Sequence, residues 1–155
     1  LYNQEGELVT RESLQGEWVV MNFIFTRCTM PEMCPAATTR MARLQREARE
    51  AGLLDKLHQV TVTFDPEYDT PGILNLYAAS RDIDTAHFSF LTGNKQAIDD
   101  LMRQFGIIVV PEEGTLNHTM ATMLIDPTGK IRYRKTGSRW STQDFIERIQ
   151  AMSQP

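Results

Sequence analysis

The chain has 155 residues, of which 41% are hydrophobic and 23% are charged, and its formal net charge at pH 7 is −4. This length and apolar content suit one domain with a hydrophobic core, so we expect residues 1–155 to form a single domain. The acidic balance argues against nucleic acid as a partner, because phosphate binding needs clustered Lys and Arg. No apolar stretch approaches the ~20 residues of a membrane span. Because the sequence begins at Leu1 rather than Met, we expect an export signal or membrane anchor to be missing from it.

The first predicted elements place an apolar strand directly before a helix. Residues 1–17 predict a short hairpin or extended arm that turns at Glu5-Gly6. Trp18–Phe25 is apolar without alternation, as expected of a central strand covered on both faces. The following helix is opened by Pro35 as a first-turn proline and stopped by Gly52. Its predicted inner positions are Ala37, Met41, Leu44, Ala48 and Ala51.

The middle of the chain predicts a second strand and two further helices. Val60, Val62 and Phe64 alternate as a strand, and Thr70-Pro71 caps and starts a helix that runs to about Ser80. Asn94 caps the next helix, which Gly106 ends. The core face of that helix is predicted to be Ile98, Leu101, Met102 and Phe105. We expect a loop from Ile107 to His118.

The last third of the chain predicts a hairpin and a helix. Thr119–Ile125 and Lys130–Lys135 are strands around the turn 126–129, and the final helix follows Ser141 and buries Phe145, Ile149 and Met152. A parallel strand–helix–strand unit followed by a hairpin and a helix is a thioredoxin-like arrangement. The predicted fold class is therefore α/β, with a central mixed β-sheet flanked by helices.

Cys28 and Cys34 are the only two cysteines, and they bracket the loop between the first strand and its helix. Side chains six positions apart on one continuous helix would point in different directions, so shared chemistry requires Cys28 at the strand end and Cys34 at the helix N-terminus. The helix dipole would there stabilise a thiolate, the form that both metal ligation and disulfide exchange need. Two small buried hydrophobes or a structural disulfide are the alternatives. The placement at a strand-to-helix junction favours function.

His118 precedes a predicted strand that, in a thioredoxin-like sheet, neighbours the strand carrying Cys28. Its imidazole would then approach the cysteines from the facing loop, whereas a lone histidine is more commonly a capping or loop residue. Two thiolates and one imidazole form a soft three-coordinate site that favours copper, above all Cu(I). Zinc needs a fourth ligand or water and is the second choice. His58 and His87 lie elsewhere and are assigned structural roles.

Several other side chains lie near the predicted site in the sequence. Asp65 and Asp69 follow the second strand at the same edge of the sheet, where they would orient His118, hydrogen-bond the cysteine loop or serve the turn itself. Met30 and Met33 lie between the cysteines, where packing is favoured over thioether ligation. The cations of the hairpin indicate a solvated edge strand; they are Lys130, Arg132, Arg134 and Lys135.

Taken together, these motifs resemble the Sco/SenC family of copper-binding, thioredoxin-fold proteins over nearly the whole chain. The matching segments are Asn22-Phe23-Ile24-Phe25-Thr26-Arg27-Cys28, Cys34-Pro35, Thr63-Phe64-Asp65-Pro66-Glu67-Tyr68-Asp69-Thr70-Pro71, Phe90-Leu91-Thr92-Gly93 and His118-Thr119 leading to Leu124-Ile125-Asp126-Pro127-Thr128-Gly129-Lys130. The resemblance implies that Cys28, Cys34 and His118 bind a copper ion, either as Cu(I) or as Cu(II). It also implies an exported or membrane-tethered protein in the periplasm or cell envelope. Five residues separate the cysteines where the family motif has three, and Asn117 stands in place of the usual Asp.

The leading hypothesis is a metallochaperone rather than an enzyme, which passes copper to an oxidase subunit by ligand exchange. Family members help to build the copper centre of cytochrome c oxidase or reduce the disulfide of its apo-site. The alternative is an extracytoplasmic thiol–disulfide oxidoreductase, in which Cys28 or Cys34 attacks a disulfide of a partner protein and the other cysteine resolves it. A peroxiredoxin-like peroxidase is a weaker alternative: Phe25-Thr26 before Cys28 resembles that family, whose Thr-to-Cys spacing is wider.

Overall fold

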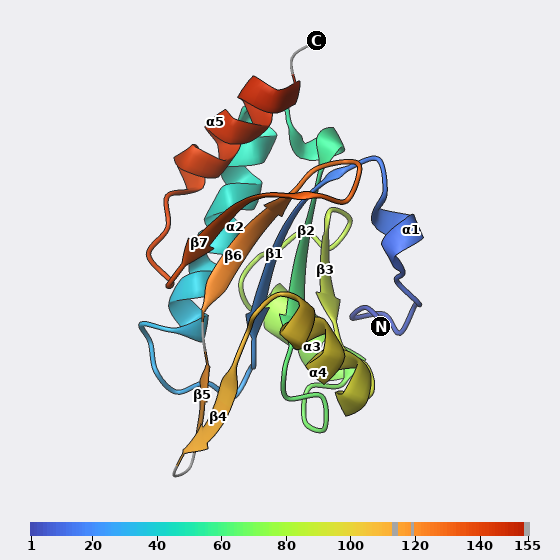
Figure 1. Ribbon diagram of the computed structural model, residues 1–155, viewed down its shortest axis with the longest axis vertical. Helices are drawn as coiled ribbons and strands as arrows, with labels where there is room; N and C mark the ends of the chain where they lie inside the picture. The colour runs from blue at the N-terminus through green and yellow to red at the C-terminus, as the bar shows by residue number, and fades with distance from the viewer. Residues whose placement is uncertain (113–114, 119, 154–155) are drawn as a thin grey trace.

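The computed structural model describes the backbone of residues 1–112, 115–118 and 120–153, and the side chains of these residues outside 109–119. Within them, a mixed sheet of five strands has the order β3-β2-β1-β6-β7, and β4 and β5 form a separate two-stranded sheet. Helices pack against the larger sheet (Figure 1). The predicted α/β architecture, a central mixed sheet flanked by helices, is confirmed.

Strand β1 (Trp18–Ile24) lies at the centre of this sheet, and all seven of its residues are buried. It pairs in parallel with β2 (Leu57–Thr63) and antiparallel with β6 (Ala121–Ile125). A strand covered on both faces needs apolar residues at successive positions, which is why this segment lacks alternation. The prediction of a central strand next to the one that follows His118 is confirmed.

Helix α2 (Cys34–Glu50) connects the two parallel strands and begins with a proline in its first turn. Gly52, at φ +73°, directly follows the helix end in the left-handed conformation that glycine adopts without strain. The predicted inner residues Ala37, Met41, Leu44 and Ala48 are buried. Ala51 is exposed instead, because the helix ends at Glu50 and Ala51 only caps it.

The two helices in the middle of the chain begin where their capping residues predict. The Thr70 hydroxyl accepts a hydrogen bond from the amide of Ile73 at the start of α3 (Pro71–Ala79), and the Asn94 side chain accepts one from Ala97 in α4 (Lys95–Gln104). Between them lies β3 (Phe88–Leu91), parallel to β2, which the sequence did not predict. Four residues, one of them Ser89, are too few to show a period, so only the pairing with β2 identifies them as a strand.

The predicted loop over 107–118 is also wrong in part. It contains β4 (Val109–Glu112) and β5 (Thr115–His118), which pair antiparallel with Val109 opposite His118. A proline at position 111 disfavours a strand, because proline cannot donate to a ladder. A separate ribbon of two strands tolerates it, since each strand there has an edge with no neighbour.

The hairpin and last helix follow the prediction with one exception. β6 and β7 (Ile131–Thr136) flank the turn at 126–129, and β7 is an exposed edge strand, as its run of cations indicated. Helix α5 (Thr142–Ser153) buries Phe145, Ile146 and Ile149. Met152 is 41% exposed, so its prediction as a core residue is wrong; it lies in the last turn, where little of the fold remains to cover it.

The N-terminal segment covers the outer edge of β3. It forms the predicted short hairpin, in which Tyr2 bridges Leu8 across a turn that contains Gly6 at φ +79°. Tyr2 also bridges Thr92, and the buried side chain of Gln4 accepts a hydrogen bond from the amide of Phe90. A short helix that was not predicted, α1 (Arg11–Leu14), then leads to β1.

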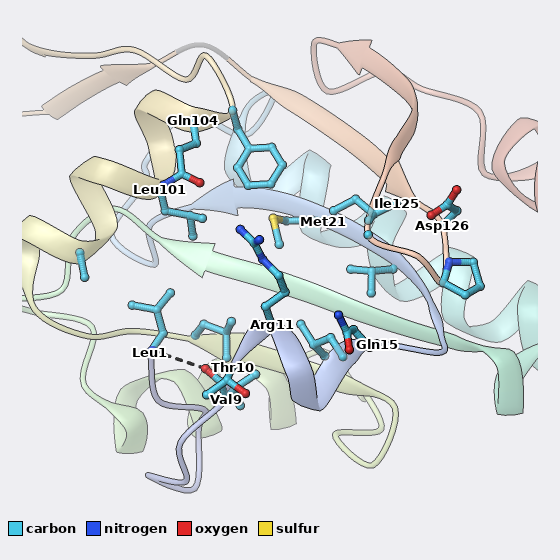
Figure 2. A pocket seen from close by; sticks show the side chains of 17 residues that line it. Leu1, Val9, Thr10, Arg11, Gln15, Met21, Leu101, Gln104, Ile125 and Asp126 are labelled. Atoms are coloured by element: carbon cyan, nitrogen blue, oxygen red, sulfur yellow. Dashed lines mark hydrogen bonds between the residues drawn. The ribbon is translucent and has the colours of Figure 1, made fainter.

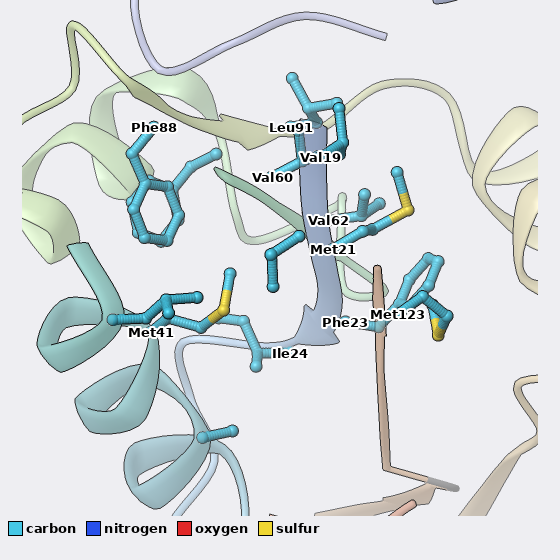
Figure 3. Packing of buried hydrophobic residues seen from close by; sticks show 14 of the residues in the cluster. Val19, Met21, Phe23, Ile24, Met41, Val60, Val62, Phe88, Leu91 and Met123 are labelled. Atoms are coloured by element: carbon cyan, nitrogen blue, oxygen red, sulfur yellow. The ribbon is translucent and has the colours of Figure 1, made fainter. Parts of the chain in front are cut away.

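Side chains of β1 divide the hydrophobic core into two layers (Figure 3). Ile24 lies on the side of Met41 from α2, whereas Val19, Met21 and Phe23 lie on the other side of the strand. Phe23 packs against Phe105, which directly follows α4, with ring centroids 5.9 Å apart. No helix among the described residues is long and apolar enough to cross a bilayer.

Candidate functional site

The two cysteines lie at the positions that the sequence predicts. Cys28 follows the end of β1, and its amide donates to the carbonyl of Phe25 at 3.3 Å. Cys34 is the first residue of α2. The segment between them includes a turn in which the amide of Met33 donates to the carbonyl of Met30 at 3.0 Å. The loop therefore places both cysteines at the carboxyl end of the central strand.

Cys28 and Cys34 do not form a disulfide, and Cys28 is close enough to raise the pKa of the Cys34 thiol. Cys34 is completely buried, whereas Cys28 is half-buried. Cys28 is therefore the more accessible of the two thiols.

Burial raises the pKa of the Cys34 thiol above its usual range, and the neighbouring Cys28 raises it further. Backbone hydrogen bonds at Phe25 and at Cys34 itself act in the opposite direction but are outweighed. The predicted stabilisation of the Cys34 thiolate by backbone N–H groups is present, but loss of hydration has the larger effect and favours the protonated thiol. A thiophilic metal would have to displace this proton on binding.

Asp69 ties the start of the cysteine loop to the end of β2. Its carboxylate is fully buried and accepts hydrogen bonds from the amide of Thr26 at 3.1 Å and from the Thr63 hydroxyl at 2.6 Å. The Thr26 hydroxyl also donates to it. The prediction that Asp69 hydrogen-bonds the cysteine loop is confirmed. Asp69 thus fixes the backbone two residues before Cys28.

Two further contacts hold the loop from its exposed side. The Arg27 guanidinium donates to Asp65 at 2.9 Å and lies over the ring of Tyr68, 4.3 Å from its centroid. Asp65 thus also hydrogen-bonds the cysteine loop, which was one of the roles predicted for it. The Ser138 hydroxyl donates to the carbonyl of Glu32 near the other end of the loop. Two separate parts of the chain, residues 65–69 and Ser138, therefore anchor the segment that carries the thiols.

The backbone of His118 ends β5, just before the strand that pairs with β1. Thr122 of β6 lies opposite Asn22 near the carboxyl end of β1, so the chain brings His118 toward the end of the sheet that carries the cysteines. The His118 side chain is outside the described side chains, and its role as a ligand stays a prediction. Among the described residues, no group of three His, Cys, Asp or Glu is placed to hold a metal ion.

The prediction that Met30 packs against the fold is wrong, because its side chain is 45% exposed in the loop. His58 has the structural role that was predicted for it. The ring of His58 hydrogen-bonds the Ser89 hydroxyl at 2.7 Å across β2 and β3, and burial lowers its pKa. His58 belongs to the sheet rather than to the cysteine site.

Comparison with known proteins agrees with this arrangement of strand, loop and helix. The sequence model of the SCO1/SenC family matches residues 1–154. The chain belongs to the SCO1/SenC family. The SCO1 protein homolog of Bacillus subtilis is 33% identical over 133 residues, 83% of this chain and 67% of that relative. A SCO2-like protein of Rickettsia conorii is 32% identical over 137 residues, 84% of this chain and 63% of that relative. The matched region is about two thirds of the length of these SCO1/SenC relatives.

Solved structures of SCO1/SenC proteins share the whole fold. A SCO1/SenC family lipoprotein from Bacillus anthracis superposes with a TM-score of 0.90 at 29% identity, over 99% of this chain and 91% of that one. BsSco, a member of the Sco family of cytochrome c oxidase assembly proteins with a disulfide switch, has a TM-score of 0.85 at 30% identity, over 98% and 89%. Arabidopsis thaliana ScoI, whose structure contains copper, has the same fold with a TM-score of 0.83 at 22% identity, over 100% and 96%.

Proposed function

We propose that this protein binds a copper ion through Cys28, Cys34 and His118 and delivers it to a subunit of cytochrome c oxidase. The observation that carries the proposal is the pair of thiols at the carboxyl end of β1, one half-buried and one buried. Membership of the SCO1/SenC family supports it, as do the copper in Arabidopsis ScoI and the oxidase assembly role of the family of BsSco.

The donor chemistry of the site fits copper as the transferred ion. Two thiolates are soft ligands that select Cu(I) over hard, oxygen-preferring cations. Cys34 supplies a ligand shielded from water, and Cys28 supplies one that a partner protein reaches. An incoming ligand of the partner would replace Cys28 first, and the copper would leave as Cys34 takes its proton back. The five residues between the cysteines give the loop room to open during this exchange.

We further propose that residues 1–155 form one domain that works outside the cytoplasm, behind an export signal or membrane anchor. The lipoprotein from Bacillus anthracis, with the same fold at 29% identity, supports this placement. An oxidising compartment would also make the redox state of Cys28 and Cys34 relevant to copper binding. Expression of the full-length gene product with a periplasmic or cell-surface reporter tests this placement.

An anaerobic titration of the reduced protein with Cu(I) against a competing chelator tests the copper site. We expect one tight equivalent, at least tenfold weaker in His118→Ala, because loss of the imidazole leaves two ligands. His87→Ala is the matched control, since it removes an imidazole from another part of the chain, and its affinity should equal that of the wild type. No tight equivalent, or equal affinity of His118→Ala and wild type, would overturn the three-ligand site.

A second candidate function, thiol–disulfide exchange, is favoured by the unequal exposure of the two sulfur atoms. The Cys28 thiolate would attack a partner's disulfide to form a mixed disulfide, and Cys34 would then attack Cys28 and release the partner as a dithiol. The partner gains two electrons, and this protein becomes a Cys28–Cys34 disulfide. The disulfide switch described for BsSco makes such a bond relevant in this family.

Trapping experiments distinguish exchange from copper delivery. With Cys34→Ser the mixed disulfide on Cys28 should accumulate when an oxidised model peptide is added, because nothing resolves it. Cys28→Ser should trap far less, because Cys34 is buried. Equal trapping by the two variants would contradict the assignment of Cys28 as the attacking thiol.

A further inference from the structure

A pocket of about 470 Å³ lies on the face of the sheet opposite α2, between the N-terminal segment and α4 (Figure 2). Its volume lies within the range of small-molecule sites, roughly 300–1,000 Å³. Its walls are mainly aliphatic and come from the N-terminal segment, β1 and α4. The side chains that matter here are Val9, Leu14, Val19, Met21, Leu101 and Phe105.

Arg11 is the only Lys or Arg side chain among the described residues that line this pocket. Figure 2 shows its guanidinium extending from α1 into the space between Leu101 and Met21. Arg11 is exposed, and no carboxylate among the described residues forms an ion pair with it. A guanidinium directed along apolar walls without an internal counter-charge is complementary to an anionic group on an apolar ligand.

The acidic residue that also lines the pocket is not available as the partner of Arg11. Asp126 is buried and ion-paired with Arg132 at 2.6 Å, and it accepts further hydrogen bonds from Thr128 and from the amide of Lys130. Its presence disfavours a ligand with several negative charges. One unpaired guanidinium, one occupied carboxylate and aliphatic walls together favour a ligand with a single negative charge.

We propose that this pocket binds a single-chain amphiphile with one carboxylate, of the fatty-acid class. The aliphatic chain would lie against Val19, Met21 and Leu101, and the carboxylate would pair with Arg11. A flexible chain suits the lining better than a planar ring does, because Phe105 is the one aromatic residue among the lining side chains. Amide groups of Gln15 and Gln104 also line the pocket and offer further donors to the carboxylate.

The pocket is separate from the cysteine site. It uses Val19 and Met21 in the first half of β1, whereas Cys28 follows the end of the strand. The ligand would occupy the space between α4, the N-terminal segment and the sheet. Its binding should therefore stabilise the packing of the N-terminal segment against the sheet. Neither copper nor the thiol pair takes part in the binding.

Titration with dodecanoate below its aggregation concentration, followed by NMR of the ¹⁵N-labelled protein, tests this site, with dodecanol as the uncharged probe. We expect saturable binding of one dodecanoate, with shifts confined to residues around the pocket. Arg11→Gln should weaken dodecanoate at least tenfold and leave dodecanol unchanged. Arg46→Gln on α2 is the matched control, because it removes an exposed cation away from the pocket, and it should bind both probes as the wild type does.

Ala97→Trp tests the apolar part of the site without altering the charge. Ala97 is exposed on α4 and lines the pocket, so a large side chain there should fill the pocket and abolish binding of both probes while the protein stays folded. Three results would each overturn the proposal: no saturable binding of dodecanoate, equal affinity of dodecanol and dodecanoate, or unchanged dodecanoate affinity in Arg11→Gln. Because copper is absent from the assay, these outcomes are independent of the proposed copper function.

Discussion

Two buried carboxylates hold two different parts of this molecule together. Asp126 begins the β6–β7 turn and accepts hydrogen bonds from Thr128, Lys130 and Arg132, all within six residues of it. Asp69 lies at the carboxyl ends of β1 and β2 and binds Thr63, six residues before it, and Thr26, which is 43 residues away. The first carboxylate organises a hairpin, and the second connects the strand that carries the cysteines to its neighbour.

Asp69 and Asp126 are similarly buried and hydrogen-bonded, but they connect different parts of the chain. Their loss should therefore have different consequences. Loss of either carboxylate should destabilise the protein, because its donors would be left without a strong acceptor. Only the loss of Asp69 should change the positions of the thiols, since Thr26 is two residues before Cys28. The following predictions test this difference.

Asp69→Asn should have the largest effect. An amide cannot accept all of the hydrogen bonds that the carboxylate accepts, and we expect the free energy of unfolding to fall by about 3 kcal/mol. If the site binds copper as proposed, the Cu(I) affinity of the folded variant should also fall by about 10–100-fold, as for other groups that support metal ligands. Urea unfolding and a Cu(I) competition titration measure the two effects. If Asp69→Asn is destabilised but its Cu(I) affinity is unchanged, Asp69 has only a structural role.

Asp126→Asn is the matched variant in the hairpin. We expect it to lose about 2 kcal/mol of stability, because its ion pair with Arg132 and its turn hydrogen bonds weaken. Its Cu(I) affinity should equal that of the wild type. If the Cu(I) affinity of Asp126→Asn falls as far as that of Asp69→Asn, the stability of the fold alone determines copper binding. The hairpin and the cysteine loop would then not differ in this respect.

The stabilisation by Asp126 should depend on pH in a predictable direction. Burial alone would raise the pKa of this carboxyl, but hydrogen bonds from Thr128, Lys130 and Arg132 outweigh it, so the pKa in the folded protein is below the ordinary value. A lowered folded pKa means that the stabilisation is complete above the unfolded pKa of about 4 and is lost as the pH falls through the folded pKa. The stability difference between wild type and Asp126→Asn should therefore be constant from about pH 5 to 8 and shrink in acid. A difference that grows on acidification would contradict this.

Thr26→Val and Thr128→Val sharpen the comparison at the level of single hydroxyl donors. Each removes one hydrogen bond to a buried carboxylate, and each should cost about 1 kcal/mol. Thr26→Val should also weaken Cu(I) binding severalfold, whereas Thr128→Val should not. If the two variants have equal copper affinities, the Thr26 hydrogen bond does not determine the position of the thiols, and other contacts of the loop do.

Arg27→Gln should have the smallest effect on stability. Arg27 is 56% exposed in its pair with Asp65, and exposed ion pairs contribute roughly 0–1 kcal/mol because water and salt screen them. We expect a loss of less than about 0.5 kcal/mol in thermal unfolding at physiological ionic strength. A loss as large as that of Thr26→Val would mean that the exposed side of the loop is anchored as firmly as the buried side.

The sequence by itself determined the elements whose cause is local. The apolar run Trp18–Phe25, the caps at Thr70 and Asn94, and the turn at 126–129 depend on hydrogen bonds and periodicity within a few residues. The pattern therefore predicted them correctly. The placement of Cys28 at a strand end and Cys34 at a helix start followed from the same local reasoning, whereas the α/β fold with its mixed sheet was predicted from the order of the elements together with the family resemblance.

Only the tertiary structure decided what depends on contacts between distant segments. β3 is a strand because it pairs with β2, and Ala51 and Met152 are exposed because the fold does not reach them. The pKa of Cys34 is raised because several elements bury it, which the dipole of one helix does not offset. Of the three roles open to Asp69, contact with Thr26 emerged only when β1 and β2 aligned side by side. Such effects arise from burial and from long-range hydrogen bonds. The pattern of neighbouring residues in the sequence therefore does not predict them.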